Sequence, residues 1–161
     1  MNKYMKEALL LAEKAGQMGE IPVGAVVVKD GEIIATGRNR REEMHSALGH
    51  AEIEAIHNAS EALGTWRLDG CELYVTLEPC PMCAGAIISS RISKLTYGAF
   101  DPSMGACDSK TNMFSCNFGQ KTEVWAGIDE EPCSKILTSF FKDLRNRQND
   151  SEDWNNGSNS Q

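Results

Sequence analysis

Three side chains of this sequence have the chemical type and the spacing to hold a transition metal. His50 is followed thirty residues later by Cys80, and Cys83 comes three residues after that. One imidazole nitrogen and two thiolates suit zinc, and three protein ligands leave a fourth position open for water, as in catalytic sites. A structural site would need a fourth protein ligand. We therefore expect one Zn²⁺ ion per chain, bound by these three side chains.

A carboxylate stands next to the expected metal. Glu52 follows His50 by two residues, too close in the sequence to be the obvious fourth ligand. A carboxylate in that place can accept a proton from water and donate it again, which is general acid–base catalysis. The pattern His-x-Glu followed by Pro-Cys-x-x-Cys, here residues 50–52 and 79–83, is the signature of zinc-dependent nucleobase deaminases. It predicts that Glu52 is the catalytic residue.

The likeness to a known family extends well beyond this motif. From about Met5 to Arg147 the chain resembles the bacterial tRNA-specific adenosine deaminases, which form inosine at the wobble position. The metal motif alone indicates only the deaminase superfamily, whereas the flanking stretches indicate the tRNA branch. These stretches are residues 19–26, 62–68, 73–80, 83–86, 90–92, 97–99, 101–102 and 140–145.

The resemblance implies a fold, a reaction and a partner. The fold is the cytidine-deaminase-like α/β fold, a three-layer α/β/α arrangement around a central five-stranded mixed sheet. The reaction is hydrolytic deamination, in which water attacks C6 of adenine and Glu52 passes protons to the ring nitrogen and to the departing ammonia. The family is homodimeric, and the apolar stretch from Ala84 to Ile88 is the expected contact surface between the two chains.

The family pattern also predicts residues that bind the substrate. Asn39 matches an asparagine that binds the base, although it also fits a turn. Asp101 matches an aspartate near the target ribose, and Asp-Pro is also an ordinary turn signal. Phe141 and Arg145 match the terminal helix that meets the anticodon loop. The full predicted set is Asn39, Ala51, Pro79, Asp101, Phe141 and Arg145.

Hydrophobic periodicity and turn signals predict the elements that carry these residues. Helices are predicted over residues 3–19, 50–63, 81–90 and 129–147, and strands over 23–29, 33–37, 73–77, 94–100 and 121–126. Strands that alternate with helices indicate an α/β layered sheet. Both halves of the metal motif then lie at the starts of helices, where the helix dipole favours thiolates.

Length and composition predict one deaminase domain over residues 1–147 and a disordered polar tail over 148–161. The sequence has no apolar run long enough to span a membrane and no export signal, so we expect a cytoplasmic protein. The net charge is −7, and without the tail it is −4, from 20 acidic and 16 basic residues. An RNA partner must therefore be held by local basic patches and by contacts to its bases.

The chain departs from the family pattern in three stretches. Residues 117–121 lack the usual Asn-His pair, residues 109–112 are altered, and 47–49 replace the usual Pro-Thr-Ala. In the family these stretches border the mouth of the substrate site. A deaminase of a free nucleobase or nucleoside, such as guanine, cytosine or a modified purine, is therefore the alternative function. A structural zinc module is a remote alternative, because no fourth Cys or His lies at short spacing.

Overall fold

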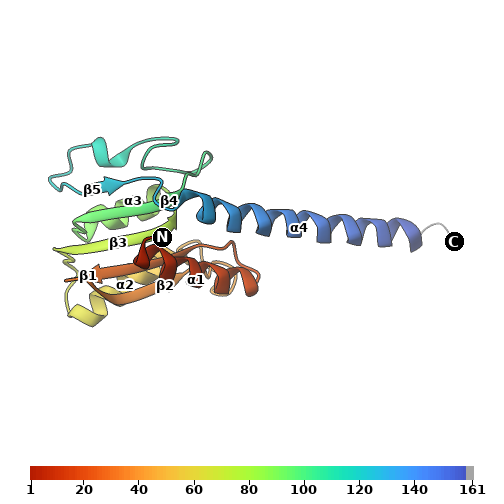
Figure 1. The fold of residues 1–161 in the computed structure, drawn as a ribbon, viewed down its shortest axis with the longest axis horizontal. Helices are drawn as coiled ribbons and strands as arrows, with labels where there is room; N and C mark the ends of the chain where they lie inside the picture. Colours follow the sequence, from red (N-terminus) through yellow and green to blue (C-terminus); the bar gives the residue numbers. More distant parts are fainter. Residues whose placement is uncertain (159–161) are drawn as a thin grey trace.

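The computed structural model describes residues 1–158, with side-chain surroundings through residue 153 (Figure 1). Every predicted helix and strand is present, with boundaries shifted by at most two residues except at the end of the last helix. The elements in chain order are α1 (Lys3–Gln17), β1 (Gly24–Lys29), β2 (Glu32–Arg38), α2 (Ala51–Leu63), β3 (Cys71–Leu77), α3 (Pro81–Ser89), β4 (Lys94–Ala99), the 3-10 turn η1 (Met113–Ser115), β5 (Glu123–Trp125) and α4 (Glu130–Ser158).

The strands form one five-stranded sheet in the order β2-β1-β3-β4-β5. The β1 strand pairs antiparallel with both β2 and β3, whereas β3, β4 and β5 run parallel. Parallel neighbours need a crossover, and α3 supplies it between β3 and β4. The predicted mixed sheet is confirmed.

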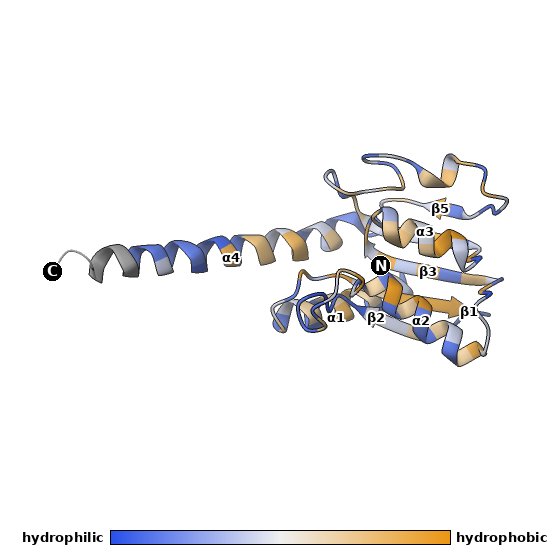
Figure 2. Cartoon of the chain, turned by 180° about the vertical axis from the view of Figure 1, so that it is seen from behind, coloured by the Kyte–Doolittle hydropathy of each residue, from blue (hydrophilic) through white to orange (hydrophobic). Residues whose placement is uncertain are grey.

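Helices cover both faces of this sheet. The α1 and α4 helices contact each other on one face, and α2 and α3 contact each other on the opposite face (Figures 1 and 2). Successive residues of β1 point to opposite faces: Ala25 and Val27 join the core under α2 and α3, while Val26 and Val28 pack with residues of α1. The predicted three-layer α/β/α fold is confirmed.

A glycine fixes the distance between α2 and the sheet. A Cβ at Gly37 in β2 would overlap the backbone oxygen of Ala51 in the first turn of α2. Only glycine permits this close approach. It sets the start of α2, and with it His50 and Glu52, against the end of β2.

The last helix differs from the prediction. The α4 helix continues to Ser158, so residues 148–158, which the sequence predicts to be disordered, are helical in the structure, and 159–161 lie outside the described residues. Extending a formed helix adds a hydrogen bond for each residue fixed, and no proline interrupts this stretch. The stretch contains one large apolar residue, Trp154, and the helix extends away from the sheet (Figure 1). The domain boundary at residue 147 stays a prediction.

Two further observations concern surfaces. Ala84, Ile87 and Ile88 of α3 are buried in the chain's own core, so only Gly85 and Ala86 of the expected dimer surface lie partly at the outside. Among residues 1–158, no helix combines the length and the apolar character needed to cross a membrane.

Candidate active site

The three predicted metal ligands meet at the starts of α2 and α3. His50 is the residue that precedes α2, Cys80 precedes α3, and Cys83 lies in the first turn of α3. The Nδ1 atom of His50 is 3.7 Å from the sulfur of Cys80 and 3.4 Å from that of Cys83. All three donor atoms lie within 4.8 Å of one another.

This geometry fits a tetrahedral zinc ion. Zn–N and Zn–S bonds of about 2.0 and 2.3 Å at a tetrahedral angle would place nitrogen and sulfur about 3.5 Å apart. The observed separations of 3.4 and 3.7 Å lie on either side of that value. Among the described residues, no other Cys, His or carboxylate joins this group. The donor set therefore has three protein ligands, the number typical of a catalytic zinc site.

The two cysteines differ in their acidity. A hydrogen bond from the Cys83 thiol, helped by His50, lowers the pKa of Cys80 to about 4. The Cys80 thiolate and burial raise the pKa of Cys83, so the remaining proton of the pair stays on Cys83. The same thiolate raises the pKa of His50. A metal that binds here displaces these protons, because its ligands must be deprotonated.

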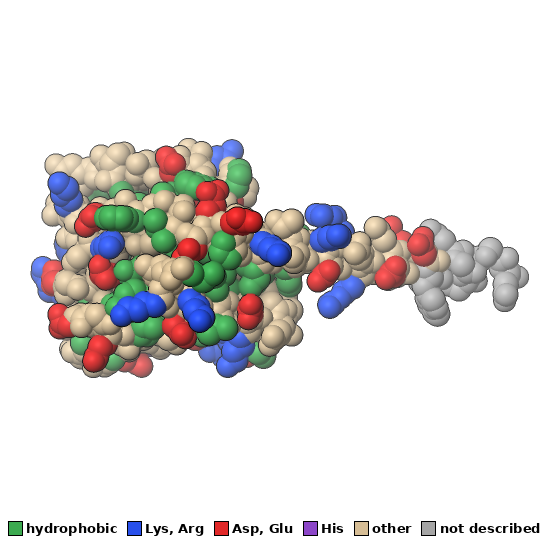
Figure 3. Space-filling view, in the orientation of Figure 1, with side chains coloured by type: hydrophobic (Ala, Val, Ile, Leu, Met, Phe, Trp, Pro, Cys, Tyr) green, Lys and Arg blue, Asp and Glu red, His purple; other side chains and the backbone are tan. Residues whose placement is uncertain are grey.

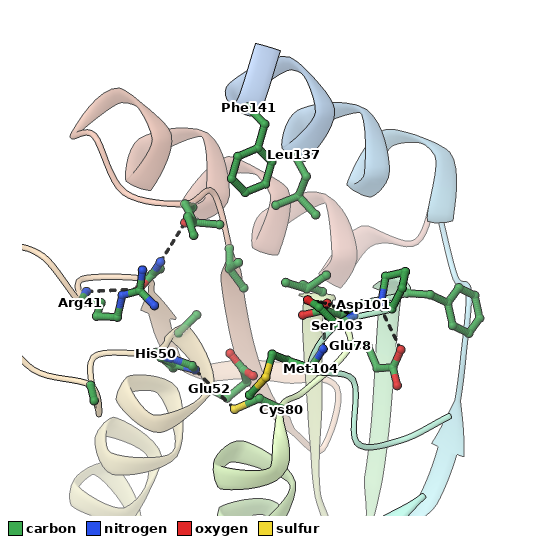
Figure 4. A pocket seen from close by; sticks show the side chains of 18 residues that line it. Arg41, His50, Glu52, Glu78, Cys80, Asp101, Ser103, Met104, Leu137 and Phe141 are labelled. Carbon is green, nitrogen blue, oxygen red and sulfur yellow. Dashed lines mark hydrogen bonds between the residues drawn. The ribbon is translucent and has the colours of Figure 1, made fainter. Parts of the chain in front are cut away.

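Glu52 lies on the floor of the site, beside these ligands (Figure 4). It is in the first turn of α2 and only 4% exposed. Burial raises its pKa, because the charged form loses its hydration. A carboxyl group whose pKa moves toward neutrality can both accept and release a proton during one catalytic cycle.

A pocket of about 520 Å³ opens above this floor. Its volume lies within the roughly 300–1,000 Å³ typical of small-molecule sites. The walls come from the segment before β1, the segment after β2, the end of β3, the loop after β4 and the first half of α4. Most lining side chains other than the floor are apolar. The lining comprises Ile21, Val23, Asn39, Arg41, Ala47, His50, Ala51, Glu52, Leu77, Glu78, Cys80, Phe100, Asp101, Pro102, Ser103, Met104, Leu137 and Phe141 (Figure 4).

Four of the six predicted substrate-binding residues line this pocket, namely Asn39, Ala51, Asp101 and Phe141. The other two do not. Pro79 is buried outside the lining, and its carbonyl accepts a hydrogen bond from the backbone N–H of Ala106 (2.9 Å). Arg145 is exposed on α4, one turn beyond Phe141 and outside the pocket.

Asn39 and Asp101 each have a local partner as well as a place in the pocket. The Asn39 amide nitrogen donates to the carbonyl of Ile21 (3.1 Å), and its oxygen accepts from the N–H of Arg41 (3.2 Å). An amide has two donor hydrogens and two acceptor sites, so one of each remains for a base edge. The Oδ1 atom of Asp101 accepts from the backbone N–H groups of Ser103 (3.1 Å) and Met104 (3.2 Å).

Several pocket residues have no counterpart in the prediction. Leu137 lies four residues before Phe141 on the same face of α4, a helical spacing from which it could have been found. Arg41, Ser103 and Met104 lie on irregular segments, whose sequence has no periodicity to show which side chains face a pocket. Their roles depend on tertiary structure.

The altered segment of residues 109–121 meets the pocket wall from behind at its first residue, because the N–H and the hydroxyl of Ser109 both donate to Glu78. None of its residues is among the lining residues. Asn112 caps η1 by accepting from the N–H of Phe114 (3.0 Å), and the Gln120 amide donates to the carbonyl of Ile92 (3.3 Å). Of the altered stretch at residues 47–49, Ala47 does line the pocket. The departure from the family pattern therefore leaves the floor unchanged but affects the wall, at Ala47 directly and at Glu78 through Ser109.

Comparison with known proteins agrees with the fold and identifies the family. Residues 1–145 match the MafB19-like deaminase family. The tRNA-specific adenosine deaminase of Bacillus subtilis (strain 168) is 49% identical over 146 residues, which cover 90% of this chain and 91% of that protein.

Two solved structures extend this comparison. A tRNA:A34 deaminase, studied for A-to-I editing at the wobble position of transfer RNA, has a TM-score of 0.82 at 46% identity and covers 85% of this chain and 100% of its own. The guanine deaminase of Bacillus subtilis has a TM-score of 0.59 at 44% identity, over 62% of this chain and 66% of its own. The predicted resemblance is thus confirmed, and the chain belongs to the MafB19-like deaminase family as a member of the tRNA-specific adenosine deaminases.

Proposed function

We propose that this protein hydrolytically deaminates adenosine to inosine at the wobble position of tRNA. Zn²⁺, one per chain, is held by His50, Cys80 and Cys83, and Glu52 is the catalytic residue. The observation that carries the proposal is the buried Glu52 carboxyl group beside the three ligands at the floor of the pocket. The name and activity of the relatives support adenosine in tRNA as the substrate.

The chain's own residues divide the reaction between them. When bound, zinc supplies Lewis-acid activation of the water nucleophile. The Glu52 carboxylate takes a proton from the attacking water and delivers it to the ring nitrogen of adenine. It then transfers the remaining proton of that water, now on the hydroxyl group at C6, to the amino group, so that ammonia leaves. The free hydrogen and lone pair of the Asn39 amide orient the base edge.

The rim of the pocket suits a nucleotide that is part of a polymer. Phe141 lines the pocket and is 38% exposed, so part of its side chain is accessible to a neighbouring unpaired base. Such stacking is how single-stranded RNA is commonly held. Arg145 and Lys142 are exposed nearby on α4 and can contact phosphates. Figure 3 shows basic side chains on α4 between the body and the acidic residues farther out.

A second candidate is the deamination of a free purine. The likeness to the guanine deaminase of Bacillus subtilis favours it, because the two proteins share 44% identity over the matched part. The pocket volume alone would suit either substrate. The two candidates differ in whether the exposed residues of α4 contribute to substrate binding.

An ammonia-release assay distinguishes them. The zinc-loaded protein is incubated with an anticodon stem-loop that carries adenosine at the wobble position, the same stem-loop with guanosine there, free adenosine and free guanine. We expect ammonia from the adenosine stem-loop alone. Release from a free base or nucleoside without release from the stem-loop would refute the tRNA substrate and leave only the zinc chemistry.

We also propose a cytoplasmic homodimer. All six cysteines are free, which fits a compartment that keeps thiols reduced. The dimer is supported by the family alone, since most of the apolar side chains of α3 face their own core. Light scattering at micromolar concentration tests it, and a monomeric mass would contradict it.

A further inference from the structure

A buried carboxylate that is neither a metal ligand nor the proton carrier holds one wall of the pocket. Glu78 directly follows β3 and is 2% exposed. Its side chain lines the pocket beside Asp101 and Met104 of the loop after β4 (Figure 4). We refer to residues 100–109 as the wall loop.

Both oxygens of the Glu78 carboxylate are occupied by the wall loop. Oε1 accepts hydrogen bonds from the backbone N–H of Asp101 (3.0 Å) and from the hydroxyl of Ser109 (2.5 Å). Oε2 accepts from the backbone N–H groups of Cys107 (3.2 Å), Asp108 (2.9 Å) and Ser109 (2.9 Å). One side chain thus gathers five donors from both ends of the loop.

The wall loop is folded tightly around this carboxylate. A Cβ at Gly105 would overlap the carboxylate of Glu78, so the loop passes there only as glycine. Burial alone would raise the pKa of Glu78, but the hydrogen bonds from Ser109 and the backbone lower it below its usual range. The carboxylate is therefore ionised at neutral pH, and hydrogen bonds to a charged acceptor are about twice as strong as neutral ones.

We propose that Glu78 is a positioning residue, which fixes the wall loop so that Asp101 meets the substrate in a defined place. The proposal rests on the proposed function in one respect, that Asp101 contacts the substrate. The constraint continues along the loop, because the Asp101 side chain in turn accepts hydrogen bonds from Ser103 and Met104.

A single substitution at Glu78 can remove the hydrogen bond at one end of the wall loop and keep those at the other end. In Glu78→Gln, the amide oxygen can still accept from the three backbone N–H groups that face Oε2. The amide nitrogen then replaces Oε1 and presents a donor to the N–H of Asp101, whereas the Ser109 hydroxyl can turn and accept from it. The Asp101 end of the loop is released, and the end at residues 107–109 stays attached.

The experiment measures kcat, KM, zinc content and amide hydrogen exchange of Glu78→Gln with the wobble stem-loop as substrate. We expect KM to rise about tenfold, as for the loss of a hydrogen bond to a charged group. We expect kcat at saturation and zinc content close to wild type, and faster exchange in the wall loop at Asp101. Glu72→Gln, a partly exposed carboxylate on β3 at the end far from the pocket, is the control and should change none of these.

A double-mutant cycle tests whether Glu78 acts through Asp101. Asp101→Ala should raise KM much less in the Glu78→Gln background than in wild type, because the released Asp101 no longer contributes. Additive effects, lost zinc or unchanged exchange would overturn the proposal. If Glu78→Gln does not fold, Ser109→Ala removes one of the five bonds and should raise KM about threefold, again with faster exchange at Asp101.

A failure of the proposed function would give a different experimental result from a failure of the positioning role. A wild-type protein that does not deaminate the stem-loop refutes the tRNA substrate. The exchange measurement needs no substrate, so it still decides whether Glu78 holds the wall loop. Unchanged exchange in Glu78→Gln would refute the positioning role even where wild-type turnover is normal.

Discussion

The metal end of the pocket and its outer rim are built from different kinds of structure. At the metal end, Glu52 and Cys83 lie in the first turns of two neighbouring helices, and His50 and Cys80 are the residues that precede those helices. Away from the metal, most lining side chains come from irregular segments and from α4. At the metal end Glu52 and Cys83 are buried, His50 and Cys80 are partly buried, and the spacing is fixed by helix geometry. The rim is partly exposed and is held by individual hydrogen bonds.

This difference assigns different parts of catalysis to the two ends. Residues at the metal end act on the reacting atoms, so their loss lowers kcat. Residues at the rim contact the parts of the substrate that do not react, so their loss raises KM. The following predictions test this division, beginning with the largest expected effect.

The largest effect is expected for Glu52→Gln, because a glutamine side chain cannot accept and release the protons. General acid–base catalysis is typically worth about 10²–10⁴-fold, and Glu52 handles more than one transfer. We expect kcat to fall by at least about a hundredfold, with zinc content and KM nearly unchanged. Retention of more than about a tenth of the activity would reject Glu52 as the proton carrier. Glu61→Gln, an exposed carboxylate on the same helix, is the matched control.

Removal of the metal tests the assignment of the zinc ligands. Chelation of zinc should abolish turnover and lower the melting temperature, since a ligand that binds only the folded state stabilises it. Zinc added back should restore both. Cys83→Ala should bind less than one zinc per chain, whereas Cys116→Ser, at an exposed cysteine outside the site, should bind one. A zinc site that survives Cys83→Ala would contradict the ligand assignment.

An effect of intermediate size is expected at the rim. Phe141→Ala should raise KM for the stem-loop about tenfold, because stacking of one base is worth about 1–3 kcal/mol. Phe118→Ala removes an exposed ring outside the pocket and should leave KM unchanged. An equal loss in both variants would show that the rim has no special role.

A smaller effect is expected for the charge next to this ring. Arg145→Ala should weaken stem-loop binding and reduce the slope of log K against log salt by about one, as for one phosphate contact. Binding is measured by titration at several salt concentrations. An unchanged slope would remove Arg145 from the RNA contact.

The smallest effect is expected for deletion of residues 148–161. The residues of this stretch whose surroundings are described, 148–153, are exposed and carry no basic side chain. We expect stem-loop turnover within about twofold of the full chain, as for surface changes of ±0.5 kcal/mol. A tenfold loss would show that the outer turns of α4 contribute to the substrate site.

The two ends of the pocket also differ in how far the sequence predicts them. His50 and Glu52 are two residues apart on one helix, and Cys80 and Cys83 three apart on another, so local spacing alone shows a metal site. Leu137 follows the same helical rule from Phe141. The sheet order and layers follow from the resemblance and from alternating strands and helices.

The remaining pocket residues, the partners of Glu78 and the length of α4 depend on tertiary structure. Arg41 and Met104 lie on irregular loops, where no period indicates the direction of a side chain. Glu78 is placed beside the ligands by its sequence position, but its five donors come from residues 23 to 31 positions later. The residues after Arg147 are mostly polar, and their composition predicts disorder, whereas α4 continues to Ser158. Composition alone does not show that a helix already formed by packing can continue.

The central claim is that the metal end sets the chemical step and the rim sets substrate binding. Single-turnover deamination of the wobble stem-loop, measured over a range of enzyme concentrations in excess of RNA, tests it most directly. We predict that Phe141→Ala reaches the wild-type rate at saturation, while Glu52→Gln stays slow at every concentration. A saturated rate of Phe141→Ala as low as that of Glu52→Gln would contradict the account.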